Sequence, residues 1–259
     1  MERIGFIGMG NMARAIAEGF LRSGAVPAER MSACAKRFDR LEAYCAPKGI
    51  HPCRDAAEVI ARSDAVIVAV KPYLVEEVLR GHTDALKDKV VLSVATGWTH
   101  AKYRALLDAS TRVQYIMPNT PCGVGEGVLL FEEEHSLTED EHAEAERLFS
   151  ALGVVQELPT HLMGAATAIT GCGPAFAAMM IEALADGGVK HGLPRATAYR
   201  LASQMLIGTG KLQLATGAHP GAMKDAVCSP AGTTIRGVEA LEANGFRHAV
   251  IEAVSATLK

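Results

Sequence analysis

The pattern of apolar and polar positions changes at about residue 160 of this 259-residue chain. Before that point, short β-branched runs alternate with helix-like stretches. The run from Ala65 to Val70 is apolar at every position, which is typical of a strand covered on both faces. This β-α-β rhythm predicts a parallel sheet with right-handed crossovers. Strands are expected at Arg3–Gly8, Met31–Ala35, Ala65–Val70, Lys89–Val94 and Arg112–Met117, then near Gly127–Phe131 and Val154–Glu157. Helices are expected at Asn11–Ser23, Arg37–Tyr44, Ala56–Arg62, Leu74–Leu86 and His100–Leu107.

The second half has a different rhythm, because strand signals stop from about Thr160 and Ala, Met, Leu and Ile dominate. The stretch Pro174–Val189 is apolar nearly all round, so a helix there must be buried on several sides. A half of about 100 residues offers too little surface to cover it, and we therefore expect burial between subunits. The sequence predicts an α/β fold, in which an N-terminal Rossmann-type parallel-sheet domain (residues 1–159) precedes an all-helical dimerisation domain (residues 160–259).

A glycine-rich turn follows the first predicted strand and opens the first predicted helix. Gly8 permits a tight turn, Gly10 lets the backbone approach a pyrophosphate, and Ala13 lets the helix pack close to the strand. The helix N-terminus adds a positive dipole. A glycine turn without a ligand is the alternative, but the strand-turn-helix context favours dinucleotide binding. The residues expected to contact the cofactor here are Gly8, Met9, Gly10, Asn11, Met12 and Ala13.

The end of the second predicted strand bears on the choice of cofactor. Folds that prefer NAD place an acidic residue there to hold the ribose hydroxyls. In this chain the strand ends at Ala35 and is followed by Lys36 and Arg37, which suit a 2′-phosphate. The alternative is that both cations merely begin the next helix on a solvated face. The sequence therefore favours NADPH, with NADH as the less favoured cofactor.

Bulk composition excludes several classes of protein. The formal net charge of −3 argues against nucleic-acid binding. Without a signal-peptide pattern or an apolar stretch of roughly 20 residues, we expect a cytoplasmic protein with no membrane partner. The six cysteines are scattered, as in reduced intracellular proteins.

Two polar features of the chain are expected to have no special role. The acidic run Glu132–Glu134, with Thr138–Arg147 after it, is expected to form a solvated loop and helix. His135 and His142 lie in this stretch, but their spacing matches no metal motif, so no metal site is expected.

Three further segments end predicted parallel strands, where ligands lie in open α/β folds. They are Ala69-Val70-Lys71-Pro72, Ser93-Val94-Ala95-Thr96-Gly97 and Met117-Pro118-Asn119-Thr120-Pro121. A fourth segment, Asp225–Gly237, offers backbone N–H groups and three hydroxyls as a helix begins, which suits a small carboxylate, although an ordinary helix cap is the alternative. Together with the opening Gly5-Phe6-Ile7-Gly8-Met9-Gly10-Asn11-Met12, these segments resemble the pyrroline-5-carboxylate reductase family over essentially the whole chain.

The resemblance implies NADPH-dependent reduction of the cyclic imine pyrroline-5-carboxylate to L-proline, the last step of proline biosynthesis. It also implies a small-molecule substrate and a homo-oligomer, at least a dimer and in the family's pattern a ring of dimers. Ala231 departs from the family loop, which often has glycine there. Beyond the glycine turn, the implied cofactor contacts are Ala35, Lys36, Arg37, Ala69, Val70, Lys71, Pro72, Ala95, Thr96 and Asn119. The implied substrate-binding residues are Ser229, Gly232, Thr233 and Thr234.

Thr234 is the expected catalytic residue, with its hydroxyl hydrogen-bonded to the ring nitrogen; pure carboxylate binding is the alternative. Lys71 is another candidate acid, but its place after a strand favours contact with the cofactor. Lys190 would be catalytic in a β-hydroxyacid dehydrogenase, whose glycine-rich helix motif is not recognisable here. A non-enzymatic alternative is a redox sensor that binds NADP(H) without turnover.

Overall fold

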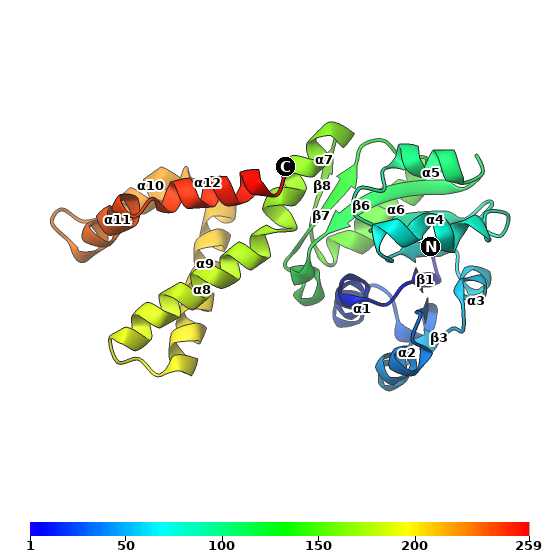
Figure 1. The fold of residues 1–259 in the computed structure, drawn as a ribbon, viewed down its shortest axis with the longest axis horizontal. Coiled ribbons are helices and arrows are strands. Elements are labelled where there is room, and N and C mark those ends of the chain that lie inside the picture. The colour runs from blue at the N-terminus through cyan, green and yellow to red at the C-terminus, as the bar shows by residue number, and fades with distance from the viewer. Residues whose placement is uncertain (259) are drawn as a thin grey trace. The chain divides into compact units, whose positions relative to one another are not determined.

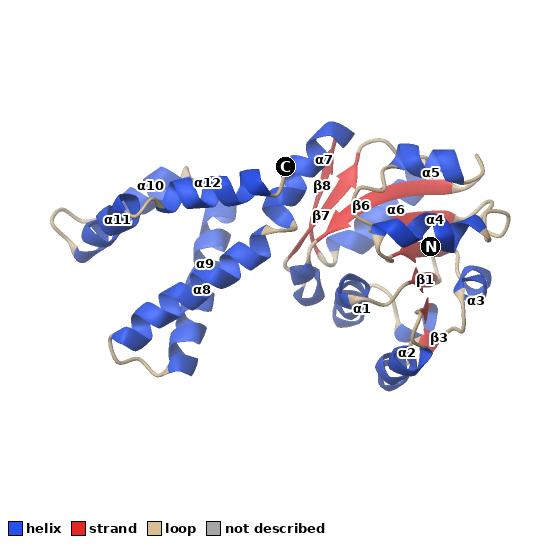
Figure 2. Ribbon diagram, in the orientation of Figure 1, coloured by secondary structure: helices blue, strands red, loops and turns tan. Residues whose placement is uncertain are grey.

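The computed structural model describes residues 1–258, which divide into two compact units, Met1–Gly171 and a second that begins at Cys172. The first unit is built on an eight-stranded sheet in the order β3-β2-β1-β4-β5-β6-β7-β8 (Figures 1 and 2). Every pair is parallel except β6 with β7. The first six strands have the doubly wound order of a dinucleotide-binding fold. The strands are β1 Ile4–Ile7, β2 Met31–Cys34, β3 His51–Pro52, β4 Ala65–Val68, β5 Val90–Ser93, β6 Arg112–Pro118, β7 Gly127–Glu132 and β8 Gly153–Leu158.

Helices cover both faces of this sheet, which explains why β1, β2, β4 and β5 are buried at every position. Successive side chains point to opposite faces, so Phe6 and Ile7 enter two different hydrophobic clusters. The Phe6 cluster includes residues of α1, α2 and α6, and the Ile7 cluster includes residues of α3, α4 and α5. These helices are α1 Asn11–Ser23, α2 Phe38–Cys45, α3 Ala56–Arg62, α4 Val75–Arg80, α5 His100–Leu106 and α6 Glu139–Ser150.

Two local expectations were wrong. The helix expected over Leu74–Leu86 is shorter, because α4 ends at Arg80 and turns follow from Gly81. The residues after Gly81 include His82, Thr83 and Asp84, which have low helix propensity. The acidic run was expected to be solvated throughout, yet Glu132 is fully buried at the end of β7, while Glu133 and Glu134 are exposed.

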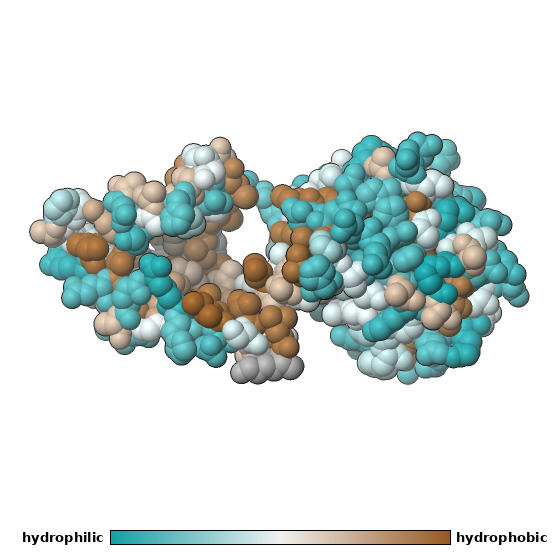
Figure 3. Space-filling view, turned by 90° about the horizontal axis from the view of Figure 1, so that it is seen from above, coloured by the Kyte–Doolittle hydropathy of each residue, from teal (hydrophilic) through white to brown (hydrophobic). Residues whose placement is uncertain are grey.

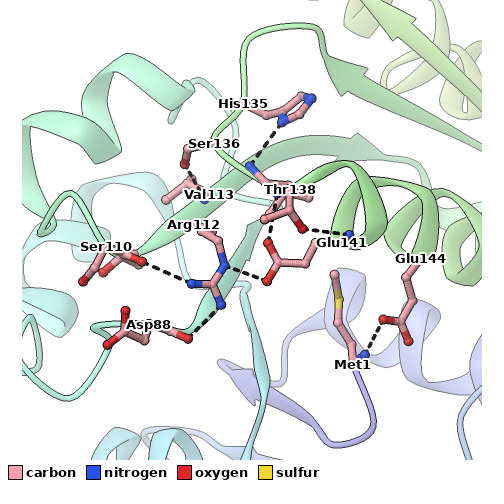
Figure 4. Close-up of polar contacts among 12 residues, drawn as sticks. Met1, Asp88, Ser110, Arg112, Val113, His135, Ser136, Thr138, Glu141 and Glu144 are labelled. Atoms are coloured by element: carbon pink, nitrogen blue, oxygen red, sulfur yellow. Dashed lines mark hydrogen bonds and ion pairs between the residues drawn. The ribbon is translucent and has the colours of Figure 1, made fainter.

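The N-terminus of α6 is anchored by polar contacts (Figure 4). The Thr138 hydroxyl accepts a hydrogen bond from the Glu141 backbone N–H, and the Glu141 carboxylate accepts one from the Thr138 backbone N–H, which makes a capping box. Arg112 of β6 donates to the Glu141 carboxylate at 2.6 Å. Ser136 joins the same strand through Val113, whose N–H donates to the serine hydroxyl at 2.8 Å. The loop after β7 is therefore fixed on the sheet.

Helix α7, Thr160–Thr170, packs on the first unit, where Met163 joins a small cluster with Tyr115 and Leu130. The boundary between the two compact units consequently lies one helix later than residue 159. The second unit contains α8 Gly173–Lys190, α9 Arg195–Thr216, α10 Pro220–Ala226, α11 Thr233–Ala243 and α12 Phe246–Ala256.

The second unit has little core of its own. Its fully buried apolar side chains are small alanines, whereas large apolar side chains are exposed on several helices, as the brown surface in Figure 3 illustrates. They include Met179, Leu201, Met205, Ile207, Leu212, Leu214, Val250 and Ile251. Among the described residues, one helical stretch, Thr160–Lys190, is long and apolar enough to span a membrane by length and composition alone. Exposed apolar faces of this extent need a covering surface.

Candidate functional site

A cavity of about 1160 Å³ lies in the first unit, at the carboxyl ends of the central parallel strands. This edge, where the strand order reverses beside β1, is where doubly wound folds bind ligands. The cavity is lined by most of the cofactor residues predicted from sequence: Gly8, Met9, Gly10, Asn11, Met12, Ala35, Lys36, Arg37, Ala69, Val70, Lys71, Pro72, Ala95 and Thr96. Ala13 is instead fully buried, in keeping with a packing role between α1 and the sheet.

The glycine turn has the backbone that its sequence requires. Gly8 has a φ of +97°, and a Cβ added there would lie 2.8 Å from the carbonyl oxygen of Ala69. Around Gly10, the N-cap of α1, a Cβ would meet open space among the described residues. No side chain within residues 1–258 caps α1, and its first turn holds no acidic residue. The first N–H groups of the helix are therefore available to a phosphate.

Four cations line the end of the cavity beside β2: Lys36, Arg37, Arg40 and Arg54. The Arg37 guanidinium donates to the Asp39 carboxylate at 3.3 Å. Arg54 lies over the ring of Phe38, 3.9 Å from its centroid, and its backbone N–H donates to Glu58 at 2.9 Å. This concentration of positive charge suits a 2′-phosphate.

Sequence reasoning missed Arg40 and Arg54. Arg54 follows β3, a two-residue strand that contains Pro52 and has too little periodicity to be recognised. Arg40 lies in the first turn of α2, three positions after Arg37, which is the N-cap of that helix, and both residues line the cavity. The available signal was the closeness of Arg40 to Lys36 and Arg37 in the sequence.

Cys34 also lines the cavity, at the end of β2. Burial raises the pKa of its thiol to about 11, so the thiol is neutral at physiological pH. Cys34 is therefore no candidate nucleophile.

The loop after β5 carries Ala95 and Thr96 and is held by buried hydroxyls. The Ser93 hydroxyl oxygen accepts hydrogen bonds from the Tyr103 hydroxyl at 2.8 Å and from the Ala95 N–H at 3.3 Å. The Tyr115 hydroxyl accepts the Gly97 N–H at 3.1 Å. Burial raises the pKa of Tyr103 and of Tyr115, so both phenols stay protonated. They are structural supports beneath the cavity.

Asn119 directly follows β6, and both polar groups of its side chain make hydrogen bonds within the protein. Its amide nitrogen donates to the Thr170 carbonyl at 2.9 Å, and its amide oxygen accepts the Val128 N–H at 2.9 Å. The residue is 6% exposed. In this structure it joins β6, β7 and α7, and its predicted contact with the cofactor stays a prediction.

The hydroxyl-rich loop Ser229–Thr234 lies in the second unit, at the start of α11. Gly232 is the N-cap, and its N–H donates to the Ser229 carbonyl at 3.0 Å. A Cβ on Gly232 would lie 2.3 Å from the Ser229 hydroxyl, so a side chain there would force that hydroxyl to move. Ser229, Thr233 and Thr234 are exposed, and the described residues provide no side-chain cap for α11. The loop thus presents hydroxyls and free helix N–H groups suited to a carboxylate.

Full-length similarity identifies the family. The chain is 45% identical to pyrroline-5-carboxylate reductase of Treponema pallidum over 259 residues, which is 98% of each chain. The chain belongs to the pyrroline-5-carboxylate reductase family. It is also 38% identical to the Escherichia coli member, with 98% of this chain and 95% of that one covered. The family model for pyrroline-5-carboxylate reductase dimerisation matches residues 160–259, and one described as coenzyme F420-dependent NADP oxidoreductase matches residues 3–97.

A solved structure agrees along the same length. The NADP-bound pyrroline carboxylate reductase of Plasmodium falciparum superimposes with a TM-score of 0.90 at 29% identity, covering 100% of this chain and 97% of that one. The predicted fold class, a Rossmann-type domain followed by a helical dimerisation domain, is therefore confirmed. The dimerisation match also accounts for the apolar helices of the second unit, because a partner subunit can cover them.

Proposed function

We propose that this chain is a pyrroline-5-carboxylate reductase, which reduces 1-pyrroline-5-carboxylate to L-proline with NADPH in the last step of proline biosynthesis. The observation that carries the proposal is the cavity beside β1, where a glycine turn, an uncapped helix N-terminus and four cations meet. These features fit NADPH from its pyrophosphate to its 2′-phosphate. The family relatives carry the same reaction in their names.

The reaction adds a hydride to the imine carbon and a proton to the ring nitrogen, which converts the C=N double bond into a C–N single bond. NADPH, when bound, supplies the hydride. The protein's contribution is orientation and electrostatics. The backbone N–H groups of Gly10–Met12 bind the pyrophosphate, and Lys36 and Arg37, with Arg40 and Arg54 beside them, hold the 2′-phosphate.

On the substrate side, Ser229, Gly232, Thr233 and Thr234 bind the carboxylate and ring. Their support is the uncapped start of α11 with its exposed hydroxyls. Thr234 donates or accepts a hydrogen bond at the ring nitrogen, which orients the imine without placing a positive charge beside an iminium. Lys71 lines the cofactor cavity, which supports cofactor contact over proton donation.

We also propose that dimers assemble into a ring and that the protein is cytoplasmic. The dimerisation match and the exposed apolar side chains of α8 and α9 support assembly through the second unit. Four of the six cysteines are buried and unpaired, in keeping with a reducing compartment.

A substrate comparison tests the function. Purified protein is mixed with NADPH and pyrroline-5-carboxylate, or with NADP and a 3-hydroxy acid, and the absorbance of NADPH is followed. We expect NADPH oxidation with the imine. Turnover of the 3-hydroxy acid alone would favour a β-hydroxyacid dehydrogenase, and tight NADPH binding without turnover of either substrate would favour a redox sensor.

A further inference from the structure

Two separate loops line the cavity on the other side of β1 from the cation end. Ala69–Pro72 follows β4, and Val94–Thr96 follows β5. Trp98 joins them: its indole N–H donates to the carbonyl oxygen of Pro72 at 2.7 Å. The chain has one tryptophan, and it is half-buried at this junction.

The acceptor side of this contact is well defined. The Pro72 carbonyl also accepts the backbone N–H of Val75, which closes the short helical turn Pro72–Leu74. A carbonyl oxygen has two lone pairs, so these two donors use its full capacity. An indole N–H is a donor only, and Pro72 provides its partner. The hydrogen bond consequently fixes the β4 loop relative to Trp98.

The donor side is equally constrained. The Trp98 ring packs against Tyr103 of α5, with centroids 5.2 Å apart and an interplanar angle of 57°. Tyr103 is fully buried and donates to Ser93, which also accepts the N–H of Ala95. The backbone N–H of Trp98 in turn donates to the Ala95 carbonyl at 3.0 Å. Trp98 therefore links the loop after β4 to the buried end of β5, which holds that loop in place.

In the proposed function the cations after β2 hold the 2′-phosphate, so the loops on the other side of β1 flank the nicotinamide end of the cofactor. From these contacts we infer that Trp98 is a positioning residue for hydride transfer, which holds these two loops together as one rigid wall. The inference rests on the proposed function. It assigns Trp98 no contact with the cofactor or substrate. Rigid support matters because small displacements of reacting atoms from their productive geometry cost large factors in rate.

The test compares Trp98→Phe with the parent enzyme. Phenylalanine keeps a ring against Tyr103 and removes the N–H donor. We expect kcat to fall about twofold to tenfold, the range for loss of one neutral hydrogen bond, with a smaller change in the KM for NADPH. The primary isotope effect with NADPH deuterated at the transferred position should rise, a change that a purely structural role would not produce. Unchanged kcat and isotope effect would overturn the inference.

Two controls keep the result interpretable. Tyr73→Phe alters an aromatic residue of the same loop that is 80% exposed, and it should leave kcat unchanged. In the parent enzyme, bound NADPH should quench the fluorescence of the single tryptophan, because the cavity adjoins it. If NADPH quenches the fluorescence but Trp98→Phe leaves kcat and the isotope effect unchanged, the positioning role is refuted and the proposed cofactor site still stands. Saturating NADPH without quenching would count against the proposed cofactor site itself.

Discussion

The hydroxyl of Thr160, the first residue of α7, donates to the buried carboxylate of Glu132 at the end of β7, at 2.8 Å. The second carboxylate oxygen accepts a hydrogen bond from the backbone N–H of His100, at the start of α5, at 2.6 Å. One buried side chain thus joins a strand to the N-termini of two helices. Negative charge there is favoured by both helix dipoles.

Glu132→Ala should therefore destabilise the protein by about 1–3 kcal/mol, because two half-buried donors lose their acceptor. Urea unfolding followed by circular dichroism measures the change. Glu133→Ala, which alters the exposed neighbour, is the matched control and should change stability by no more than about 0.5 kcal/mol. Equal effects of the two substitutions would contradict the importance of the Glu132 contacts.

The role of Glu132 also shows where sequence reasoning stops. Periodicity identified the four-residue core strands, because burial on both faces leaves a continuous apolar run. The glycine turn was identified from the spacing of Gly8, Gly10 and Ala13 between a predicted strand and a predicted helix. Periodicity did not identify Glu132, because a carboxylate buried by tertiary contacts has the same local sequence as a solvated one. Arg54 was missed for a similar reason, since its approach to the cavity depends on the pairing of β3 with β2.

Cofactor discrimination tests the cation end of the cavity. Replacing both Lys36 and Arg37 with alanine should raise the KM for NADPH at least about tenfold, because charge-assisted hydrogen bonds contribute about 1.5–3 kcal/mol. The KM for NADH should change little, since NADH has no 2′-phosphate. Arg30→Ala, an exposed cation outside the cavity lining, is the control. Parallel losses with both cofactors would show that these residues do not bind the 2′-phosphate. Arg54→Ala, measured the same way, extends the test to the cation held over Phe38.

The role of Thr234 is testable by separating kcat from KM. Thr234→Ala should lower both kcat and kcat/KM if the hydroxyl acts on the ring nitrogen in the transition state. Thr234→Ser keeps the hydroxyl and should restore most of the activity. Thr209→Ala removes a hydroxyl that, within residues 1–258, bonds to Met205 of the same helix α9, and it serves as a control. A rise in KM alone would make Thr234 a binding residue.

Acidification should weaken the first unit through its histidines. Burial lowers the pKa of His100 and of His135, and the stacked His142 ring lowers the pKa of His135 further. The unfolded chain then binds more protons than the folded one just below about pH 6.5, so stability falls as pH decreases through that value. Urea midpoints at about pH 7.5 and about pH 5.5 measure the fall. His135→Gln should reduce this pH dependence. An identical pH profile for His135→Gln would rule out its contribution.

Assembly through the second unit gives the last prediction. Met179 of α8 is 68% exposed in the single chain, beside other apolar side chains that the unit does not cover itself. Covering such side chains against a partner contributes roughly 1.5–3 kcal/mol each, and a buried unpaired carboxylate would oppose that gain strongly. Met179→Glu should therefore yield a monomer in sedimentation experiments and lose reductase activity, while the intact first unit still binds NADPH. Val124→Glu places the same charge at a 66% exposed apolar site of the first unit and should leave assembly unchanged. A fully active Met179→Glu monomer would show that catalysis does not depend on assembly, and an unaltered oligomer would show that this face of α8 lies outside the subunit contact.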